Sequence, residues 1–189
     1  MKYCVDRIVR YCFKNGLISE SQVPWLRYGI EKRLSSIFGI IPFAFLASLL
    51  SDLWCALYFI LSFCFLRSRI NGYHSNTLIG CLFISLATEL LFFKVIYPLL
   101  TPIIALAIWV VCLVILLILA PYNHPNMHYS TDEVLALKIS IRRRVIILTT
   151  LFLIALAMQT ASSLRGLTLG IAMAAYMLCL AYISDWRKT

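Results

Sequence analysis

The chain has 189 residues, of which 62% are hydrophobic and only 13% are charged, and its mean hydropathy is +0.90. Soluble domains are about half apolar and about a quarter charged, so this composition excludes an ordinary soluble domain. The 17 Lys and Arg residues outnumber the 8 Asp and Glu residues, for a formal net charge of +9. Nucleic-acid binding would need a water-exposed basic face, and too little of this chain can face water. We therefore predict an all-α, polytopic membrane protein with basic loops.

The first 17 residues have the pattern of an amphipathic helix, because apolar side chains recur at helical spacing with charged side chains between them. The apolar set is Val5, Ile8, Val9, Cys12, Phe13 and Leu17. We therefore predict a helix that lies in the cytoplasmic headgroup layer and does not cross it. It serves either as an anchor for the first span or as a docking surface for an amphipathic partner, and the sequence leaves both roles open.

Six uncharged intervals follow, and each is a candidate transmembrane helix, which needs about 20 mostly apolar residues. They are Leu34–Ser51, Leu53–Leu66, Ile70–Thr88, Val95–Thr131, Val145–Leu164 and Gly166–Ser184. The second is short, but Arg67 at its end can snorkel to the interface, so we keep it. We expect six transmembrane helices within residues 34–184, preceded by the amphipathic region 1–33, in a single integral-membrane domain covering residues 1–189.

The distribution of basic residues orients these spans. With both termini in the cytoplasm, the inside segments 1–33, 67–77, 120–144 and 185–189 hold 7, 2, 4 and 2 basic residues. Only Lys94 and Arg165 of the 17 fall outside them. Cytoplasmic loops are rich in Lys and Arg, and an odd number of spans would spoil this bias. We therefore predict that both termini are cytoplasmic.

The stretch RINGYHSNTLIGCL, residues 69–82, places His74 and Cys81 seven residues apart at the cytoplasmic edge of the third span. In one straight helix this spacing separates the side chains by about 10 Å along the axis. A nucleophile and its base need hydrogen-bond reach, about 3 Å. Gly72 and the polar residues 75–77 would let the chain fold back over a helix that starts near residue 76 or 77, and that helix start would favour the Cys81 thiolate. The spacing alone leaves nucleophile and base, metal ligands, or incidental residues as alternatives.

A metal site would have to use His74, Cys81, His124 and His128, all on the predicted cytoplasmic side. No pair among them has the i, i+4 or C-x-x-C spacing of zinc ligands. The seven cysteines are scattered and mostly lie within apolar runs, which is typical of small buried hydrophobic residues. We therefore predict neither a metal nor another cofactor.

Glu89 is an ionisable residue inside the apolar part of the chain, and such residues are candidates for a functional role. We expect it to lie near the far interface of the third span. Lys94 is only five residues away, so we favour a simple ion pair between these two side chains over a role in function.

The longest polar stretch, residues 120–144, contains Pro121 and Pro125, which end the fourth span. Ser130 with Glu133 three residues later is a capping-box pattern. It predicts a short cytoplasmic helix that runs through the arginines at 142–144 into the fifth span. Three adjacent arginines beside a membrane either orient the helix and contact anionic lipid or attract an acidic peptide segment.

The order Arg67, Arg69, Gly72, Tyr73, His74 and then Cys81 resembles the accessory gene regulator B family of bacterial quorum sensing. The segment APYNHPN at 120–126 is similar to the Ala-Pro loop that follows the fourth span in that family. The length, the six expected spans and the basic amphipathic N-terminus also agree. One departure is that GYHSNT carries a single glycine where many members have a glycine pair or another small residue.

The resemblance implies a cysteine endopeptidase of the bacterial cell membrane that matures the precursor of a cyclic signalling peptide. Cys81 would be the nucleophile and His74 its base, with Arg67, Arg69 and Gly72 shaping or charging the site. Attack by Cys81 would release the C-terminal tail of the precursor and leave a thioester. A Cys or Ser of the peptide would then close a thiolactone or lactone ring.

Precursors of this family resemble an amphipathic leader joined to an acidic tail, so the expected partners are such a peptide and membrane lipid, without nucleic acid. We expect the leader to lie beside residues 1–17. The basic side chains of Lys138, Arg142, Arg143 and Arg144 would attract the tail. The sequence leaves open whether the chain forms a homodimer.

Two readings from other functional classes remain. A small transporter or peptide exporter typically has prolines in or beside its spans, as this chain has at Pro98, Pro102 and Pro121. Against this reading, the sequence shows no second charge near mid-membrane and no half-chain repeat. A scaffold that only presents the peptide is the other reading. Both should tolerate serine at position 81, whereas a peptidase should lose acyl transfer.

Overall fold

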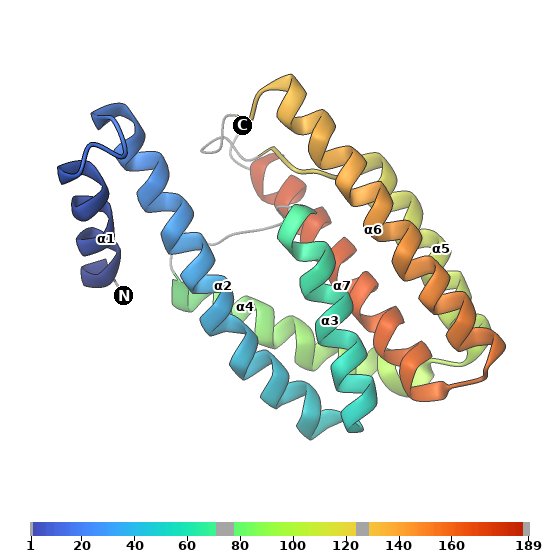
Figure 1. The fold of residues 1–189 in the computed structure, drawn as a ribbon. Helices are drawn as coiled ribbons and strands as arrows, with labels where there is room; N and C mark the ends of the chain where they lie inside the picture. The colour runs from blue at the N-terminus through green and yellow to red at the C-terminus, as the bar shows by residue number, and fades with distance from the viewer. Residues whose placement is uncertain (1, 71–77, 124–128, 187–189) are drawn as a thin grey trace. The chain divides into compact units, whose positions relative to one another are not determined.

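The computed structural model describes residues 2–70, 78–123 and 129–186, and their regular elements are all helical (Figure 1). Within these ranges, the side chains of residues 2–4, 28, 31–38, 78–79 and 185–186 lie outside the description. The elements are α1 (Lys2–Lys14), η1 (Glu20–Gln22), α2 (Val23–Leu50), α3 (Leu53–Ile70), α4 (Leu78–Leu91), η2 (Phe92–Ile96), η3 (Tyr97–Leu99), α5 (Pro102–Leu119), α6 (Thr131–Ala157) and α7 (Ala161–Trp186). The all-α prediction is confirmed for the described part of the chain.

Contacts between Cα atoms divide the chain into two compact units, Met1–Pro42 and Phe43–Thr189. The boundary falls inside α2, at the proline that this helix contains. Each unit is described by itself below. The single-domain prediction is not tested by this division and stays a prediction.

The first unit contains the predicted amphipathic helix as α1. The chain turns after it at Gly16, whose φ of +68° suits a residue without a side chain. Val5 and Val9 are buried in the structure, whereas Ile8 and Leu17 of the same apolar set are exposed. The apolar face is therefore shared between protein packing and a surface available to lipid.

The second unit is organised around α7, which lies between α3 and α5 and also contacts α6 (Figure 1). Two glycines let α7 approach α3 closely. A Cβ atom on Gly166 would lie 2.4 Å from the backbone oxygen of Cys55, which is much closer than any real contact. Because α7 is covered by its neighbours, most of its side chains from Leu164 to Ala181 are buried.

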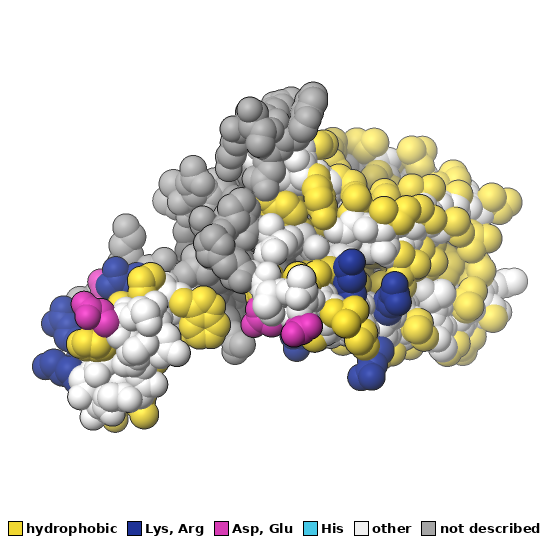
Figure 2. All heavy atoms as spheres, turned by 90° about the horizontal axis from the view of Figure 1, so that it is seen from above, with side chains coloured by type: hydrophobic (Ala, Val, Ile, Leu, Met, Phe, Trp, Pro, Cys, Tyr) yellow, Lys and Arg dark blue, Asp and Glu magenta, His cyan; other side chains and the backbone are white. Residues whose placement is uncertain are grey.

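The outer helices of this unit expose large apolar side chains. Ile103 and Ile118 of α5 are 81% and 71% exposed, and Ile146 of α6 is 64% exposed. Figure 2 shows hydrophobic side chains over much of the visible face of this unit. Such a continuous apolar surface on a monomer is typical of contact with lipid or another chain, which agrees with the predicted membrane protein.

Four helical segments in the described residues are long and apolar enough to cross a membrane, which is fewer than the six predicted. They are Leu53–Ile70, Gly80–Leu99, Pro102–Leu119 and Ala161–Ser184. Of the first expected span, only Gly39–Leu50 appears, as a shorter apolar helix within the described side chains. The membrane-protein character is retained, with four candidate spans.

The fifth expected span differs for a local reason. It was expected to reach Leu164, but α6 ends at Ala157, and the chain turns through Gln159, whose φ is +54°. The apolar part from Val145 to Ala157 is shorter than the roughly 20 residues that a full crossing needs. The expectation that the helix starting after Ser130 continues through the arginines is confirmed, since α6 is one continuous helix.

The third expected span is displaced along the chain. It was expected at Ile70–Thr88, but Ile70 is the last residue of α3, and the candidate span runs from Gly80 to Leu99 through α4, η2 and η3. Glu89 therefore lies near the middle of this segment. The expectation that Glu89 lies near the far interface stays a prediction, because helix length and composition do not give the depth of a residue in a membrane.

Candidate functional site

Cys81 is the fourth residue of α4 and lies at the beginning of the candidate span Gly80–Leu99. Its side chain is partly buried, and it is not part of a disulfide. A nucleophilic cysteine needs a thiol that is not committed to a disulfide. Cys81 meets this requirement at the start of α4.

The other members of the predicted motif divide between the described and undescribed parts of the chain. His74 and Gly72 lie outside the described residues, as do His124 and His128 of the alternative metal site. The pairing of His74 with Cys81 accordingly stays a prediction. In the part of the chain that the structure describes, no group of three or more His, Cys, Asp or Glu side chains is arranged to hold a metal ion.

Arg67 and Arg69 lie in the last turn of α3, the helix that leads into the His74 segment. Arg67 is partly buried and Arg69 is exposed. Cations are favoured at a helix C-terminus because the last backbone carbonyls carry partial negative charge. The two arginines thus place positive charge at the end of α3 that precedes His74 in the sequence.

The same end of α3 is contacted by α6 through Arg144. Its Nη1 atom donates to the backbone oxygen of Phe65 and to the Ser68 hydroxyl oxygen, the latter at 2.5 Å. The guanidinium carbon lies 4.5 Å from the centre of the Phe65 ring, within cation–π range. Arg144 therefore links two helices that are separated by more than seventy residues in the sequence.

A second contact at this end of α3 comes from the segment that follows α5. The backbone N–H of Tyr122 donates to the carbonyl oxygen of Ile70 at 3.0 Å. The Tyr122 ring meets the Tyr182 ring of α7 edge-on, at 5.1 Å between centres, and the Tyr182 hydroxyl donates to the Leu119 carbonyl. We call Phe65, Ser68, Ile70, Tyr122 and Arg144 the α3 junction.

The sequence identified Arg144 but not its partners. Tyr122 follows the Ala-Pro pair of the APYNHPN motif, and Phe65 and Ser68 looked like ordinary span residues. The sequence signal that could have indicated the packing of Arg144 against another helix was the helical periodicity of α6, whose buried residues include Ile141, Val145 and Leu148. Residue 144 lies on the edge of that stripe, since positions three and four apart share a helix face.

The remaining predicted basic residues are exposed. Lys138, Arg142 and Arg143 project from α6 to the surface, and Lys138 and Arg142 are four residues apart, so they lie on the same side of the helix. They are available to a ligand. The structure does not test the predicted contact with an acidic tail, which stays a prediction.

Glu89 is fully buried, and neither of its carboxylate oxygens has a hydrogen-bond partner. Lys94, its expected partner, is exposed, and the two side chains form no ion pair. The predicted pairing is wrong because the intervening helix carries Lys94 to the surface while Glu89 faces the packed interior.

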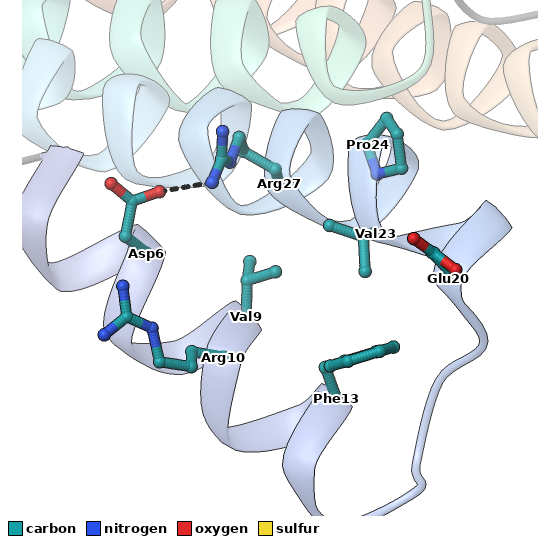
Figure 3. A pocket seen from close by; sticks show the side chains of 8 residues that line it. All are labelled: Asp6, Val9, Arg10, Phe13, Glu20, Val23, Pro24 and Arg27. Atoms are coloured by element: carbon teal, nitrogen blue, oxygen red, sulfur yellow. Dashed lines mark ion pairs between the residues drawn. The ribbon is translucent and has the colours of Figure 1, made fainter.

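A cavity of about 400 Å³ lies within the first unit, between α1 and the start of α2 (Figure 3). Val9, Phe13 and Val23 form its apolar wall, and Asp6 forms an ion pair with Arg27 at 2.6 Å beside it. None of the residues predicted for catalysis lines this cavity.

Comparison with known families gives one match. The family model described as accessory gene regulator B matches residues 5–182, a range that includes all the residues predicted for the site. This match confirms the resemblance carried by residues 67–81 and 120–126. No curated protein and no solved structure shows a significant match.

Proposed function

The chain belongs to the accessory gene regulator B family, and from this premise we propose that it is a membrane-embedded cysteine endopeptidase of quorum-sensing peptide processing. Cys81 is the proposed nucleophile and His74 the proposed base. The observation that carries the proposal is the location of Cys81. Its reduced thiol lies in the first turns of α4, at the boundary of a candidate span, seven residues after the histidine.

The proposed reaction proceeds by acyl transfer. His74 takes the proton of the Cys81 thiol, and the thiolate attacks a peptide carbonyl near the C-terminus of the precursor. The C–N bond breaks, His74 returns the proton to the leaving amine, and the tail departs with a new N-terminus. The N-terminal part of the precursor remains bound to Cys81 as a thioester.

A Cys or Ser of the bound peptide then attacks the thioester carbonyl. A new thioester or ester bond closes the ring as the bond to Cys81 breaks, and the attacking group's proton returns to Cys81. This reaction sequence consumes no water. Hydrolysis of the thioester is a competing reaction, and it would release a linear peptide in place of the cyclic product. Burial of the thioester at the edge of a span slows hydrolysis by limiting access of water.

Substrate recognition in this proposal uses charge. Lys138, Arg142 and Arg143 are exposed on α6 and attract the acidic tail, and the neighbouring Arg144 adds its charge. Arg67, Arg69 and Gly72 shape and charge the approach to His74. The amphipathic leader lies in the interface beside α1.

The membrane arrangement belongs to the proposal as well. The proposed arrangement places both termini in the cytoplasm and brings the basic segments 67–77 and 120–144 to one side of the bacterial cell membrane. The precursor is made on that side, so the nucleophile, the basic residues and the substrate share one compartment. The proposal includes no metal or cofactor.

The decisive experiment incubates the purified full-length chain with its candidate precursor and measures intact mass. We expect a hydroxylamine-labile peptide adduct with the wild type, no adduct with Cys81→Ala and a strongly reduced amount with His74→Ala. Cys64→Ala is the matched control, because Cys64 is another partly buried thiol at a different helix position. Absence of both adduct and released tail, with a precursor shown to bind, would contradict the proposal.

A transporter is the second candidate, and Glu89 is the observation in its favour. Transporters commonly use ionisable groups near the middle of a span, and Glu89 lies near the middle of Gly80–Leu99. Serine at position 81 separates the two candidates, because a transporter should still move the peptide whereas the peptidase should stop releasing the tail.

A further inference from the structure

The cavity of the first unit combines apolar and charged side chains in one small space. Its volume is about 400 Å³, and small-molecule sites measure about 300 to 1,000 Å³. Val9, Phe13 and Val23 form the apolar wall, and the other lining side chains, apart from Pro24, are charged. A ligand that matches this lining has an apolar part and a charged part, so an inorganic ion would match only half of it.

The charged side chains lie on two sides of the apolar wall. Figure 3 shows Arg10 on the side of the Asp6–Arg27 ion pair and Glu20 on the other side. The ion pair joins Nη2 of Arg27 to Asp6 at 2.6 Å. A guanidinium has five N–H donors, so Arg27 keeps donors beyond this contact. In the part of the chain that the structure describes, Arg10 and Glu20 form no ion pair.

This arrangement of charges suits one phosphate group. Guanidinium groups bind phosphate oxygens through parallel hydrogen bonds, and Arg10 and the remaining donors of Arg27 are available for such bonds. Asp6 already balances the charge of Arg27, so one negative charge beside Arg10 neutralises this side of the cavity. The Glu20 carboxylate accepts hydrogen bonds from hydroxyl groups and repels a second anion. The ligand should therefore carry a single negative charge and neighbouring hydroxyl groups.

The surface around the cavity favours a lipid as the source of the phosphate. Tyr11 and Trp25 are 66% and 71% exposed. Tyr and Trp are enriched at the headgroup level of membranes, and basic amphipathic helices bind at the same level. The helix α1 is such a helix, with Arg7 and Lys14 exposed in addition to Arg10. The first unit therefore presents the side chains that hold a protein at the depth of lipid phosphates.

We propose that this cavity binds the headgroup of an anionic phospholipid whose phosphate carries a hydroxylated group, as in phosphatidylglycerol. Arg10 and Arg27 contact the phosphate, and the headgroup hydroxyls donate to Glu20. The apolar wall contacts the glycerol and the first carbons of the acyl chains. The inference goes beyond the proposed peptidase activity and does not depend on it. It makes the first unit a site for one type of lipid, in addition to an anchor at the membrane surface.

The test uses the purified full-length chain in detergent, with phosphatidylglycerol added stepwise and bound lipid counted by native mass spectrometry. Arg10→Gln and Arg7→Gln are the matched variants, because both remove one exposed positive charge from α1 and only residue 10 lines the cavity. We expect Arg10→Gln to raise the Kd of the most tightly bound lipid about tenfold, as for loss of a hydrogen bond to a charged group. Arg7→Gln should leave this Kd close to the wild-type value. Equal Kd values for the two variants would overturn the inference.

A second matched pair tests the apolar wall. Phe13→Ala and Tyr11→Ala each remove an exposed aromatic ring from α1, and only Phe13 lines the cavity. Phe13→Ala should raise the Kd for phosphatidylglycerol severalfold, whereas Tyr11→Ala should not. Equal effects of the two variants would mean that the lipid does not enter the cavity. Thermal unfolding checks that each variant is folded, and the arginine pair decides alone if Phe13→Ala is not.

Three other ligands identify what the cavity recognises. Glycerol 3-phosphate lacks acyl chains and should bind much more weakly, and binding as tight as that of the lipid would indicate a soluble phosphate as the ligand. Phosphatidylserine has the same net charge as phosphatidylglycerol but brings a carboxylate toward Glu20. It should bind several times more weakly to the wild type and recover with Glu20→Gln. Equal affinity of the wild type for both lipids, or displacement of phosphatidylglycerol by an acidic peptide, would overturn the inference.

Discussion

A Cβ atom on Gly170 of α7 would lie 1.9 Å from the hydroxyl oxygen of Ser62 on α3, so these two residues set how closely the helices approach. The same Cβ would lie 2.8 Å from the Phe59 carbonyl oxygen, and rotation of the Ser62 side chain could not relieve that contact. Gly166 meets α3 one turn earlier. The close packing of α3 against α7 therefore depends on glycine, which has no side chain, at positions 166 and 170.

We predict that Gly170→Ala and Gly166→Ala each lower the free energy of unfolding by about 1 to 3 kcal/mol, the usual cost of overpacking. Thermal unfolding in detergent would measure the change. Gly39→Ala is the matched control, because a Cβ there meets nothing within 4 Å, and alanine in a helix is favoured over glycine by up to about 1 kcal/mol. Equal stability of the Gly170→Ala and Gly39→Ala variants would refute this account of the packing.

At Glu89 we predict the opposite change in the free energy of unfolding, because its buried carboxylate has no hydrogen-bond partner. Burying a polar group without a partner costs roughly 1 to 3 kcal/mol in mutational data. We therefore expect Glu89→Leu to raise the free energy of unfolding and to leave tail release intact. Glu20→Gln, at an exposed carboxylate, should change stability by less than about 0.5 kcal/mol.

Loss of peptide transport or processing in a stably folded Glu89→Leu variant would contradict that expectation. It would show that the chain retains the Glu89 carboxyl group for function although this group lowers the stability of the fold. Ionisable residues inside a membrane commonly have such functional roles. A stability measurement and an activity measurement on the same preparation therefore distinguish the two explanations.

The sequence predicted helix type more successfully than helix limits. Charge-free intervals located α3, α5 and α7, because a long apolar run has few alternatives to a helix in a membrane. They misplaced the third span, because Glu89 was treated as a boundary although the packed interior accommodates it. They also made the fifth span too long. The turn at Gln159 depends on a backbone conformation that cannot be predicted from the absence of charged residues.

The sequence offers a motif for the candidate site but no information about its surroundings. His74 and Cys81 share a short sequence pattern, so one stretch of chain is enough to propose them as a pair, and that pairing stays a prediction. Phe65, Ser68 and Tyr122 meet Arg144 or Ile70 only because distant elements pack together, at separations of up to seventy-nine residues. Spacing along one chain segment carries no information about such contacts.

The exposed basic residues of α6 lead to a prediction about substrate binding. Replacing Lys138, Arg142 and Arg143 together by Gln should raise KM for a precursor with an acidic tail, because their charges no longer attract it. The effect should shrink as salt increases, since surface charges are screened over about 8 Å at physiological ionic strength. Tail release at several salt concentrations would measure it.

A precursor whose tail acids are replaced by amides is the control for that prediction. Its KM should be the same for the wild type and the triple variant, because no tail charge remains to be attracted. An equal loss with both precursors would show that the substitutions damage the enzyme and that tail charge is not recognised. Thermal unfolding of the triple variant should stay close to the wild type, since all three side chains are exposed.

The capping box at the start of α6 supplies the last prediction, because it determines how well the helix that carries these basic residues is ordered. The Ser130 hydroxyl accepts from the Glu133 N–H at 3.3 Å, and the Glu133 carboxylate accepts from the Ser130 N–H at 2.9 Å. Loss of such a cap costs about 1 kcal/mol. Ser130→Ala should therefore speed hydrogen exchange of amides 132–135 severalfold, while Ser140→Ala in the same helix should not. Unchanged exchange in Ser130→Ala would mean that packing further along α6, and not the cap, keeps this end folded.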